Sequence, residues 1–312
     1  MADDRKLPAA FSLAGQRVLV TGAARGIGRA AAMAIAELGA EVVLNDIAPL
    51  DAARAAILAA GGSCMVAPGD LTVAGTIETL LAGPRIHAVA HCAGILDPRP
   101  WRDDPDWAAR FHRIMEVNAR IPLALGAACI DHMGAHGGGR VILVGSVAGH
   151  TGGTSLTTPP DYAASKGAVH TLVRWLSRQG VGQGVLINAV APGPVDTAMT
   201  IGVGIRPETL PMGRMGTPEE ARLDHCVSVH ARGRVHVRRG ARRQRRRLRG
   251  LTGTSLYFSD TRLEAEILRN ASSVASITKL ILAARDTLPV TTLQKAAASV
   301  KSWISGAARF GS

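Results

Sequence analysis

The chain has 312 residues, of which 47% are hydrophobic and 19% are charged, and this is enough apolar material for one full α/β domain plus a further segment. No stretch approaches about 18 uncharged apolar residues, and acidic residues rather than an apolar leader follow Met1, so we expect a cytoplasmic protein without a membrane span. The cysteines are scattered without metal-ligand spacing, which predicts free thiols and no metal site.

The first motif is a glycine-rich turn between an apolar run, residues 17–20, and an alanine-rich stretch, residues 27–38, which predict a strand and a helix. Gly22 permits a tight turn, Gly26 keeps side chains away from a bound pyrophosphate, and Gly28 lets the helix pack closely on the sheet. The free N–H groups at the start of the helix attract phosphates. This pattern predicts a dinucleotide site, and a glycine-rich turn that binds nothing is the alternative.

Asp46 ends the next predicted strand, residues 41–45, and follows Gly22 at about the spacing of the acid that binds the adenosine ribose. Its carboxylate accepts hydrogen bonds from the ribose hydroxyls and repels the 2′-phosphate of NADP. Arg25 favours the other cofactor, because a guanidinium in the turn pairs with that phosphate. On balance we predict NAD(H) in preference to NADP(H).

Two further predicted strands end in Asp70-Leu71 and in the turn Cys92-Ala93-Gly94. Ligands of an open parallel sheet bind beyond the carboxyl ends of its strands, so both places are expected to face the cofactor. For Asp70, capping of the following helix is an equally good interpretation.

The chemistry is expected at Ser146, which follows the predicted strand 140–145, and at Tyr162 and Lys166, which share one helix. Residues four apart lie on one helix face, so the Lys166 ammonium is expected near the Tyr162 phenol, where it favours the phenolate. This predicts Tyr162 as general acid/base, with Ser146 holding a substrate carbonyl during hydride transfer. A Tyr-x-x-x-Lys pair also occurs by chance.

Taken in chain order, these motifs resemble the short-chain dehydrogenase/reductase family over residues 13–220. The resemblance implies an α/β fold with a doubly wound parallel sheet of the Rossmann type, and NAD(P)-dependent interconversion of a secondary alcohol and a ketone. It also implies a small-molecule alcohol or carbonyl substrate and a homo-oligomer, with neither nucleic acid nor membrane as a partner. An NADPH-dependent 3-oxoacyl-thioester reductase is the alternative enzyme, and Arg25 supports it.

The family pattern also implies site residues. The implied catalytic tetrad is Asn118, Ser146, Tyr162 and Lys166, in which Asn118 binds a water that links Lys166 to solvent. The implied cofactor contacts are Gly22, Arg25, Gly26, Ile27, Gly28, Asp46, Asp70, Leu71, Cys92, Ala93, Gly94, Tyr162, Lys166, Pro192, Gly193, Val195 and Thr197.

Some positions depart from the family pattern. His91 stands where the family usually has Asn, which we expect to change a supporting hydrogen bond and no chemistry. The short stretch from Asp70 to His91 trims a helix, and the Thr-, Gly- and Pro-rich residues 151–160 predict a surface loop beside the substrate. After Thr197 the chain is apolar and contains glycines, as suits a flexible lid over a mostly apolar ligand.

The resemblance ends near residue 220, where the family continues with an apolar helix and a final strand. Residues 231–250 instead contain ten arginines and no acid, and they supply most of the formal net charge of +12. A nucleic-acid-binding arm is one interpretation, because clustered arginines neutralise phosphates. We favour a frameshift near Glu220, because the composition indicates GC-rich codons and a shifted frame can encode the missing Asp-Asn-Gly-Gly ending.

The sequence therefore divides into three parts. Residues 1–220 form a catalytic domain whose last strand is missing or replaced, residues 221–250 are an Arg-rich segment with a suspected frameshift, and residues 251–312 are a helical tail of unknown role. The tail fits a small appendage or read-through past a lost stop. A catalytically impaired product is a further alternative, because loss of the last strand exposes a sheet edge and removes a surface that the family uses for subunit contact.

Overall fold

The computed structural model describes residues 12–102, 104–153, 157–222 and 255–257. The chain separates into two compact units, residues 1–259 and 260–312, and all the described residues belong to the first of them. The arginine cluster of residues 231–250 and the predicted tail helices beyond residue 260 lie outside the described residues, and the frameshift suspected near Glu220-Ala221 stays a prediction.

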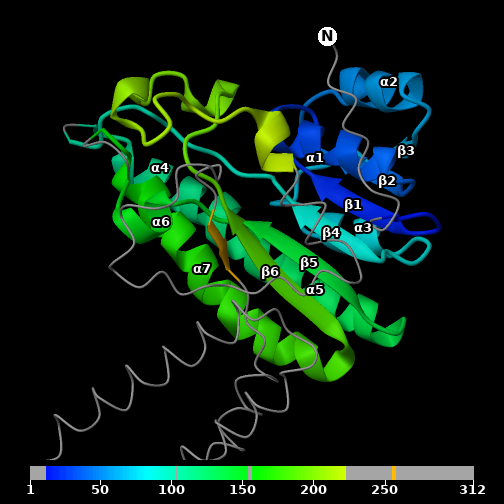
Figure 1. The fold of residues 1–312 in the computed structure, drawn as a ribbon. Helices are drawn as coiled ribbons and strands as arrows, with labels where there is room; N and C mark the ends of the chain where they lie inside the picture. Colours follow the sequence, from blue (N-terminus) through cyan, green and yellow to red (C-terminus); the bar gives the residue numbers. More distant parts are fainter. Residues whose placement is uncertain (1–11, 103, 154–156, 223–254, 258–312) are drawn as a thin grey trace, which may run out of the picture. The chain divides into compact units, whose positions relative to one another are not determined.

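A seven-stranded sheet with the order β3-β2-β1-β4-β5-β6-β7 forms the centre of the first unit (Figure 1). The strands are β1 (Arg17–Thr21), β2 (Glu41–Asn45), β3 (Ser63–Val66), β4 (Ala88–His91), β5 (Gly139–Val144), β6 (Val185–Ala191) and β7 (Ser255–Tyr257). The first six are parallel, which confirms the predicted doubly wound α/β fold. β7 pairs antiparallel with β6, so three residues of the stretch expected to be a helical tail form the edge strand.

Helices cover both faces of the sheet because successive strand residues point to opposite sides. Val18 and Val20 of β1 pack in one buried cluster with α1 and α2, whereas Leu19 packs in a second cluster with α3, α5 and α7. The helices are α1 (Gly26–Glu37), α2 (Asp51–Ala59), α3 (Thr76–Leu81), α4 (Trp107–Met115), α5 (Ile121–Ala135), α6 (Ala148–Thr151) and α7 (Pro160–Gly180). Shorter turns are the π-helix η2 (Glu116–Arg120) and the 3-10 helices η3 (Val181–Gln183), η4 (Ala198–Thr200) and η5 (Pro207–Thr209).

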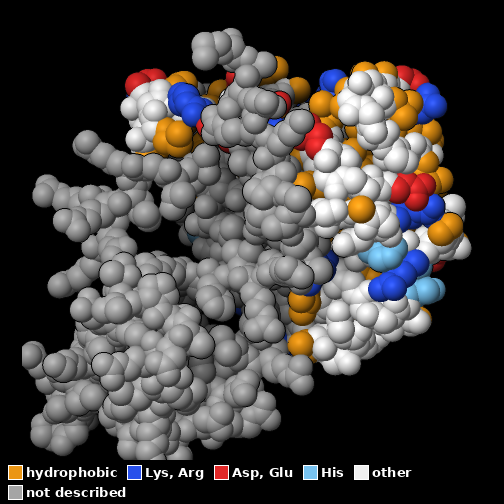
Figure 2. All heavy atoms as spheres, turned by 45° about the vertical axis from the view of Figure 1, so that its right-hand side comes forward, with side chains coloured by type: hydrophobic (Ala, Val, Ile, Leu, Met, Phe, Trp, Pro, Cys, Tyr) orange, Lys and Arg blue, Asp and Glu red, His pale blue; other side chains and the backbone are white. Residues whose placement is uncertain are grey.

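The described surface carries charged side chains of both signs. In the view of Figure 2, basic and acidic side chains are interspersed among apolar and neutral ones, so the basic side chains form no large patch on that described face. No helix among the described residues is both long and apolar enough to span a membrane. At six residues, α3 is as short as the sequence predicts.

Candidate active site and cofactor cleft

The glycine-rich turn lies at the carboxyl end of β1 and leads into α1. Gly22 has φ +68°, and a Cβ there would lie 2.6 Å from the backbone nitrogen of Ala93. A Cβ on Gly28 would overlap the carbonyl oxygen of Gly22, and one on Gly26 would lie 3.3 Å from Cγ2 of Thr197. The turn is therefore packed so closely that only glycine fits, and the structure brings the predicted residues Ala93 and Thr197 against it.

Asp46 lies directly after β2, beside the same turn. Its Oδ2 accepts a hydrogen bond from the backbone N–H of Ala24 at 2.9 Å, and its Oδ1 accepts one from Ala48 at 3.0 Å. Arg25 is exposed at the N-cap of α1, and the next residue after Asp46, Ile47, is 74% exposed. The carboxylate is thus fixed at the rim of the turn, where sequence spacing places a ribose-binding acid.

Asp70 forms a turn of its own. Its Oδ1 accepts hydrogen bonds from the backbone N–H and the hydroxyl of Thr72, both at 2.8 Å, and these bonds lower the pKa of Asp70. The side chain is exposed, whereas Leu71 is buried. The capping interpretation is wrong, because α3 begins at Thr76 behind Gly75 and has no side-chain cap, so Asp70 instead closes a local turn with Thr72. Cofactor contacts of Asp70 and Leu71 stay predictions.

Asn45, which no sequence motif singled out, joins the ends of two neighbouring strands. Its side-chain nitrogen donates to the carbonyl oxygens of Ala67 at 2.9 Å and Gly69 at 3.2 Å, and so joins the end of β2 to the segment that precedes Asp70.

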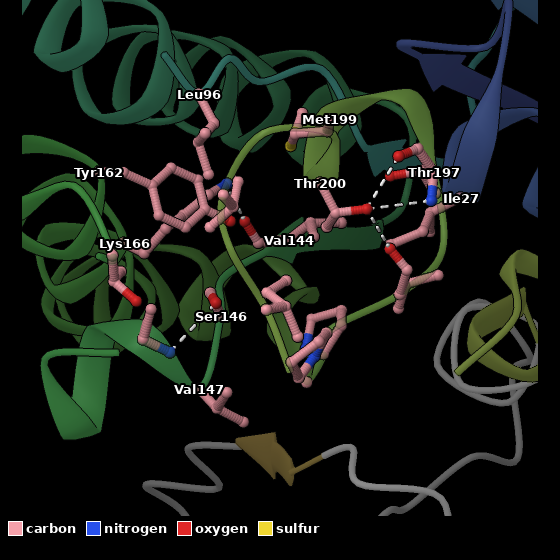
Figure 3. Close-up of a pocket in the computed structure, with 18 of the residues that line it drawn as sticks. Ile27, Leu96, Val144, Ser146, Val147, Tyr162, Lys166, Thr197, Met199 and Thr200 are labelled. Carbon is pink, nitrogen blue, oxygen red and sulfur yellow. Dashed lines mark hydrogen bonds between the residues drawn. The ribbon is translucent and has the colours of Figure 1, made fainter. Parts of the chain in front are cut away.

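Ser146, Tyr162 and Lys166 line one pocket (Figure 3). The Ser146 hydroxyl accepts a hydrogen bond from the backbone N–H of Ala148 at 3.1 Å and is hydrogen-bonded to the Tyr162 phenol. Lys166 donates from Nζ to the carbonyl oxygen of Val144 at 2.8 Å, and Nζ lies 5.8 Å from the centroid of the Tyr162 ring. The predicted trio therefore converges from the end of β5 and the first two turns of α7.

The acid–base balance in this pocket differs from the simple expectation. Burial raises the pKa of Tyr162, opposed by the hydrogen bond from Ser146, and burial lowers the pKa of Lys166 to about 8. Desolvation disfavours the charged form of each group, and the ammonium is directed at Val144 rather than at the phenol. In the described arrangement, Ser146 rather than Lys166 is therefore the group that favours the phenolate.

Asn118 is fully buried in the π-turn η2 between α4 and α5. Its side-chain amide exchanges two hydrogen bonds with the backbone of Ile95, at 2.8 and 2.9 Å, and also donates to the Ser165 hydroxyl at 3.1 Å. The widened turn of the π-helix η2 directs this side chain toward Ile95, which follows β4, and toward Ser165 of α7. Such π-helical turns occur often at functional sites. Asn118 thus connects the turn after β4 with α7, and its membership of a catalytic tetrad and its water-binding role stay predictions.

His91 joins the carboxyl ends of β1 and β4. Its Nδ1 lies 2.8 Å from the hydroxyl of Thr21, and burial lowers the pKa of His91 to about 3, so the ring is neutral at physiological pH. After it, the turn 92–94 approaches Lys166, because a Cβ on Gly94 would lie 3.5 Å from Nζ of Lys166. Burial also raises the pKa of Cys92 to about 12, which keeps its thiol protonated.

The walls of the pocket are mainly apolar, around a cavity of about 110 Å³. Ser146, Tyr162 and Lys166 stand on one side, with Ile27 and Thr197 opposite, as Figure 3 shows. The remaining apolar lining includes Leu96, Val147, Pro192, Pro194, Val195, Met199, Val203 and Ile205. Among the described lining residues, Lys166 is the only one with a basic side chain, and there is no aspartate or glutamate.

The predicted lid after Thr197 contacts segments on the other side of the pocket, at Thr157 and Pro98. Thr197 and Thr200 form a reciprocal capping box at η4, which occupies both hydroxyls. The Thr157 hydroxyl donates to the carbonyl oxygen of Val203 at 2.6 Å, and a Cβ on Gly202 would lie 3.3 Å from Cγ of Pro98. The lid therefore lies over the pocket in this structure.

Comparisons with known proteins agree with this geometry. Residues 16–206 match a family model described as short chain dehydrogenase. The galactitol 2-dehydrogenase (L-tagatose-forming) of Cereibacter sphaeroides is 35% identical over 227 residues, which cover 67% of this chain and 86% of that protein. The cis-4-hydroxycyclohexanecarboxylate dehydrogenase of Sinomonas cyclohexanicum is 31% identical, with 65% and 84% covered. A solved structure described as an NAD(P)-dependent gluconate 5-dehydrogenase from Beutenbergia cavernae, with bound NADP, is 32% identical, with a TM-score of 0.65 and 71% and 92% covered.

Proposed function

The chain belongs to the short-chain dehydrogenase/reductase family, and we propose that it transfers hydride between a nicotinamide cofactor and a secondary alcohol or ketone, with Tyr162 as the general acid/base. One observation carries the proposal. Ser146, Tyr162 and Lys166 line one pocket whose opposite side holds Ile27 and Thr197, and Thr197 in turn packs against Gly26 of the glycine-rich turn.

The residues of the pocket divide the work of carbonyl reduction. The nicotinamide supplies the hydride when it is bound. Ser146 donates a hydrogen bond to the carbonyl oxygen, and Tyr162 transfers its phenolic proton to that oxygen as negative charge develops there. Once Ser146 donates its hydrogen bond to the substrate rather than to the phenol, the Lys166 ammonium, 5.8 Å from the ring centroid, is the charge left to stabilise the phenolate. In alcohol oxidation the phenolate takes the proton back.

For the cofactor, we propose that NAD(H) is preferred because Asp46 is held at the rim of the turn by two backbone N–H groups. We expect Asp46→Ser to lower the ratio of kcat/KM with NADH to kcat/KM with NADPH by about tenfold or more, because the charge that repels the 2′-phosphate is gone.

The ratio is measured by following NADH and NADPH oxidation with one ketone. Asp51→Ser, which removes an exposed acid at the start of α2, is the matched control. An unchanged ratio for Asp46→Ser would mean that Arg25 or another group sets the preference. A wild-type preference for NADPH would instead favour the 3-oxoacyl-thioester reductase.

For the substrate, we propose an uncharged and mainly apolar ketone or secondary alcohol. The one cation of the described lining, Lys166, donates to the carbonyl oxygen of Val144, and the Thr200 hydroxyl is hydrogen-bonded to the Thr197 backbone. A carboxylate buried there without a partner is strongly disfavoured. We expect kcat/KM for cyclohexanone to exceed that for 4-oxocyclohexanecarboxylate by about tenfold or more, a difference of about 1.4 kcal/mol in transition-state binding. Preference for the carboxylate would contradict the proposal and show that Lys166 or a cation outside the described lining pairs with the substrate.

A further inference from the structure

A buried cluster of charges lies at the start of α7, outside the pocket. It consists of Arg110 on α4, Asp104 in the loop before α4, and Asp161 in the first turn of α7. Their side chains are only 4%, 12% and 0% exposed. Because a buried charge is disfavoured unless it is paired, these three groups depend on one another.

The guanidinium of Arg110 connects two separate segments. Nη1 lies 2.5 Å from Oδ2 of Asp104, and Nη2 donates to the carbonyl oxygen of Pro100 at 3.2 Å, so two of its nitrogens hold the loop between β4 and α4. Its third nitrogen, Nε, faces Oδ2 of Asp161 at 3.6 Å. The fork geometry of arginine suits such a bridge, which the single ammonium of lysine cannot reproduce.

Asp161 contacts both Arg110 and the backbone of the next residue, Tyr162. Its Oδ1 accepts the backbone N–H of Tyr162 at 2.8 Å, while Oδ2 is turned to Arg110. Within the described residues, neither Oδ2 of Asp161 nor Nε of Arg110 has a hydrogen-bond partner, so their ion pair is what compensates this buried oxygen. One carboxylate therefore contacts both the guanidinium and the backbone of the tyrosine in the pocket.

The loop that Arg110 holds is also a wall of the pocket. Leu96 lines the cavity at the beginning of this loop, and Trp101 near its end packs on Trp107 of α4 with ring centroids 5.8 Å apart. Arg110 thus stands between the substrate wall and the turn that carries Tyr162. Displacement of reacting groups by about 1 Å can lower a rate roughly a hundredfold, so this link bears on catalysis.

We propose that Arg110 is a positioning residue, which fixes Tyr162 relative to the substrate wall by joining Asp161 to the loop between β4 and α4. The proposal rests on the proposed function, since it requires Tyr162 to be the proton donor. Arg110 acts through Asp161 and does not line the pocket.

The test is a set of variants assayed as the full chain with NADH and cyclohexanone, with kcat normalised to the number of NADH-binding sites. We expect Arg110→Met to lower kcat by about 10- to 100-fold while the Kd of NADH changes less than about twofold, because the glycine-rich turn lies on β1 and α1. Adding Asp161→Asn to Arg110→Met is expected to lower kcat by less than about twofold further, because both substitutions break the same link and their effects do not multiply.

Asp104→Asn is the matched control, because it removes a carboxylate from the same guanidinium on the loop side and leaves Arg110 facing Asp161. We expect it to lower kcat by less than about threefold. A kcat of Arg110→Met within about twofold of wild type, or losses from Arg110→Met and Asp161→Asn that multiply in the double variant, would overturn the proposal. A merely structural role would reduce the number of NADH-binding sites and leave the normalised kcat unchanged.

Two further variants, Asp161→Asn and Tyr162→Phe, distinguish failure of the positioning role from failure of the proposed function. If Arg110→Met does not fold, Asp161→Asn alone serves, with an expected loss of kcat of about threefold or more at unchanged NADH affinity, and an unchanged kcat overturns the proposal. Tyr162→Phe is measured in the same series. Turnover by Tyr162→Phe would mean that the proposed function itself has failed, whereas an inactive Tyr162→Phe beside a fully active Arg110→Met refutes the positioning role alone.

Discussion

Tyr162→Phe is expected to lower kcat by about a thousandfold or more, because general acid–base catalysis contributes about 10²- to 10⁴-fold and the variant has no proton to give. The ring itself is retained, so the packing of Tyr162 against the pocket is preserved. The Ser146 hydroxyl loses its bond to the phenol but keeps the one from the Ala148 N–H. NADH binding, measured by fluorescence titration, is expected to stay within about twofold of wild type, since the proton donor acts in the chemical step.

The matched control for this variant is Thr158→Val, which removes another hydroxyl from the lining of the same pocket. We expect it to change kcat by less than about threefold, because no step of the mechanism requires that group. Turnover near the wild-type rate in Tyr162→Phe would refute the assignment of Tyr162 as proton donor. A parallel loss of NADH binding would show that the phenol holds the cofactor instead.

Gly28→Ala is expected to weaken NADH binding by about 10- to 100-fold, the equivalent of about 1–3 kcal/mol of overpacking. The added methyl group would overlap the carbonyl oxygen of Gly22, so α1 has to move away from the turn that is proposed to hold the pyrophosphate. The φ angle of Gly28 does not lie in the left-handed region, so crowding by the added methyl group is the sole effect of this change. Calorimetric or fluorescence titration with NADH measures the loss.

Gly61→Ala is the control that separates crowding from backbone strain. Gly61 has φ +78°, and a Cβ there meets nothing within 4 Å. We expect this variant to lose about 1 kcal/mol of stability, because a side chain disfavours the left-handed conformation, and to keep its NADH affinity. Equal NADH affinity of Gly28→Ala and wild type would contradict the assignment of the glycine-rich turn as the cofactor site.

Much of the site could be predicted from the sequence because its residues follow strand ends. Gly22 and Asp46 come directly after β1 and β2, and Ser146 is the second residue after β5, and parallel strands bring their carboxyl ends to one edge of the sheet. Tyr162 and Lys166 are four residues apart on one helix, which fixes their common face. Local spacing is sufficient for such groups.

Other features depend on contacts that spacing does not encode. The aim of Asn118 comes from a π-turn inside a continuous helical run, and the Arg110–Asp161 contact joins residues from two helices far apart in the chain. The raised pKa of Tyr162 follows from burial, and the Lys166 ammonium points at Val144, and a sequence motif specifies neither. Pairing of β7 with β6 likewise depends on the tertiary structure.

The measurement that tests the central claim most directly is the fate of deuterium from NADH that is labelled at the transferable position of the nicotinamide. The full chain and cyclohexanone are incubated in two separate reactions, each with NADH that carries deuterium on one of the two faces of the nicotinamide ring. The alcohol from each reaction is analysed by mass spectrometry. The account predicts that one of the two reactions gives alcohol with a single deuterium on the carbinol carbon, and that Tyr162→Phe gives almost none. Alcohol without deuterium from either face, or no alcohol with NADH or NADPH, would contradict hydride transfer by this site.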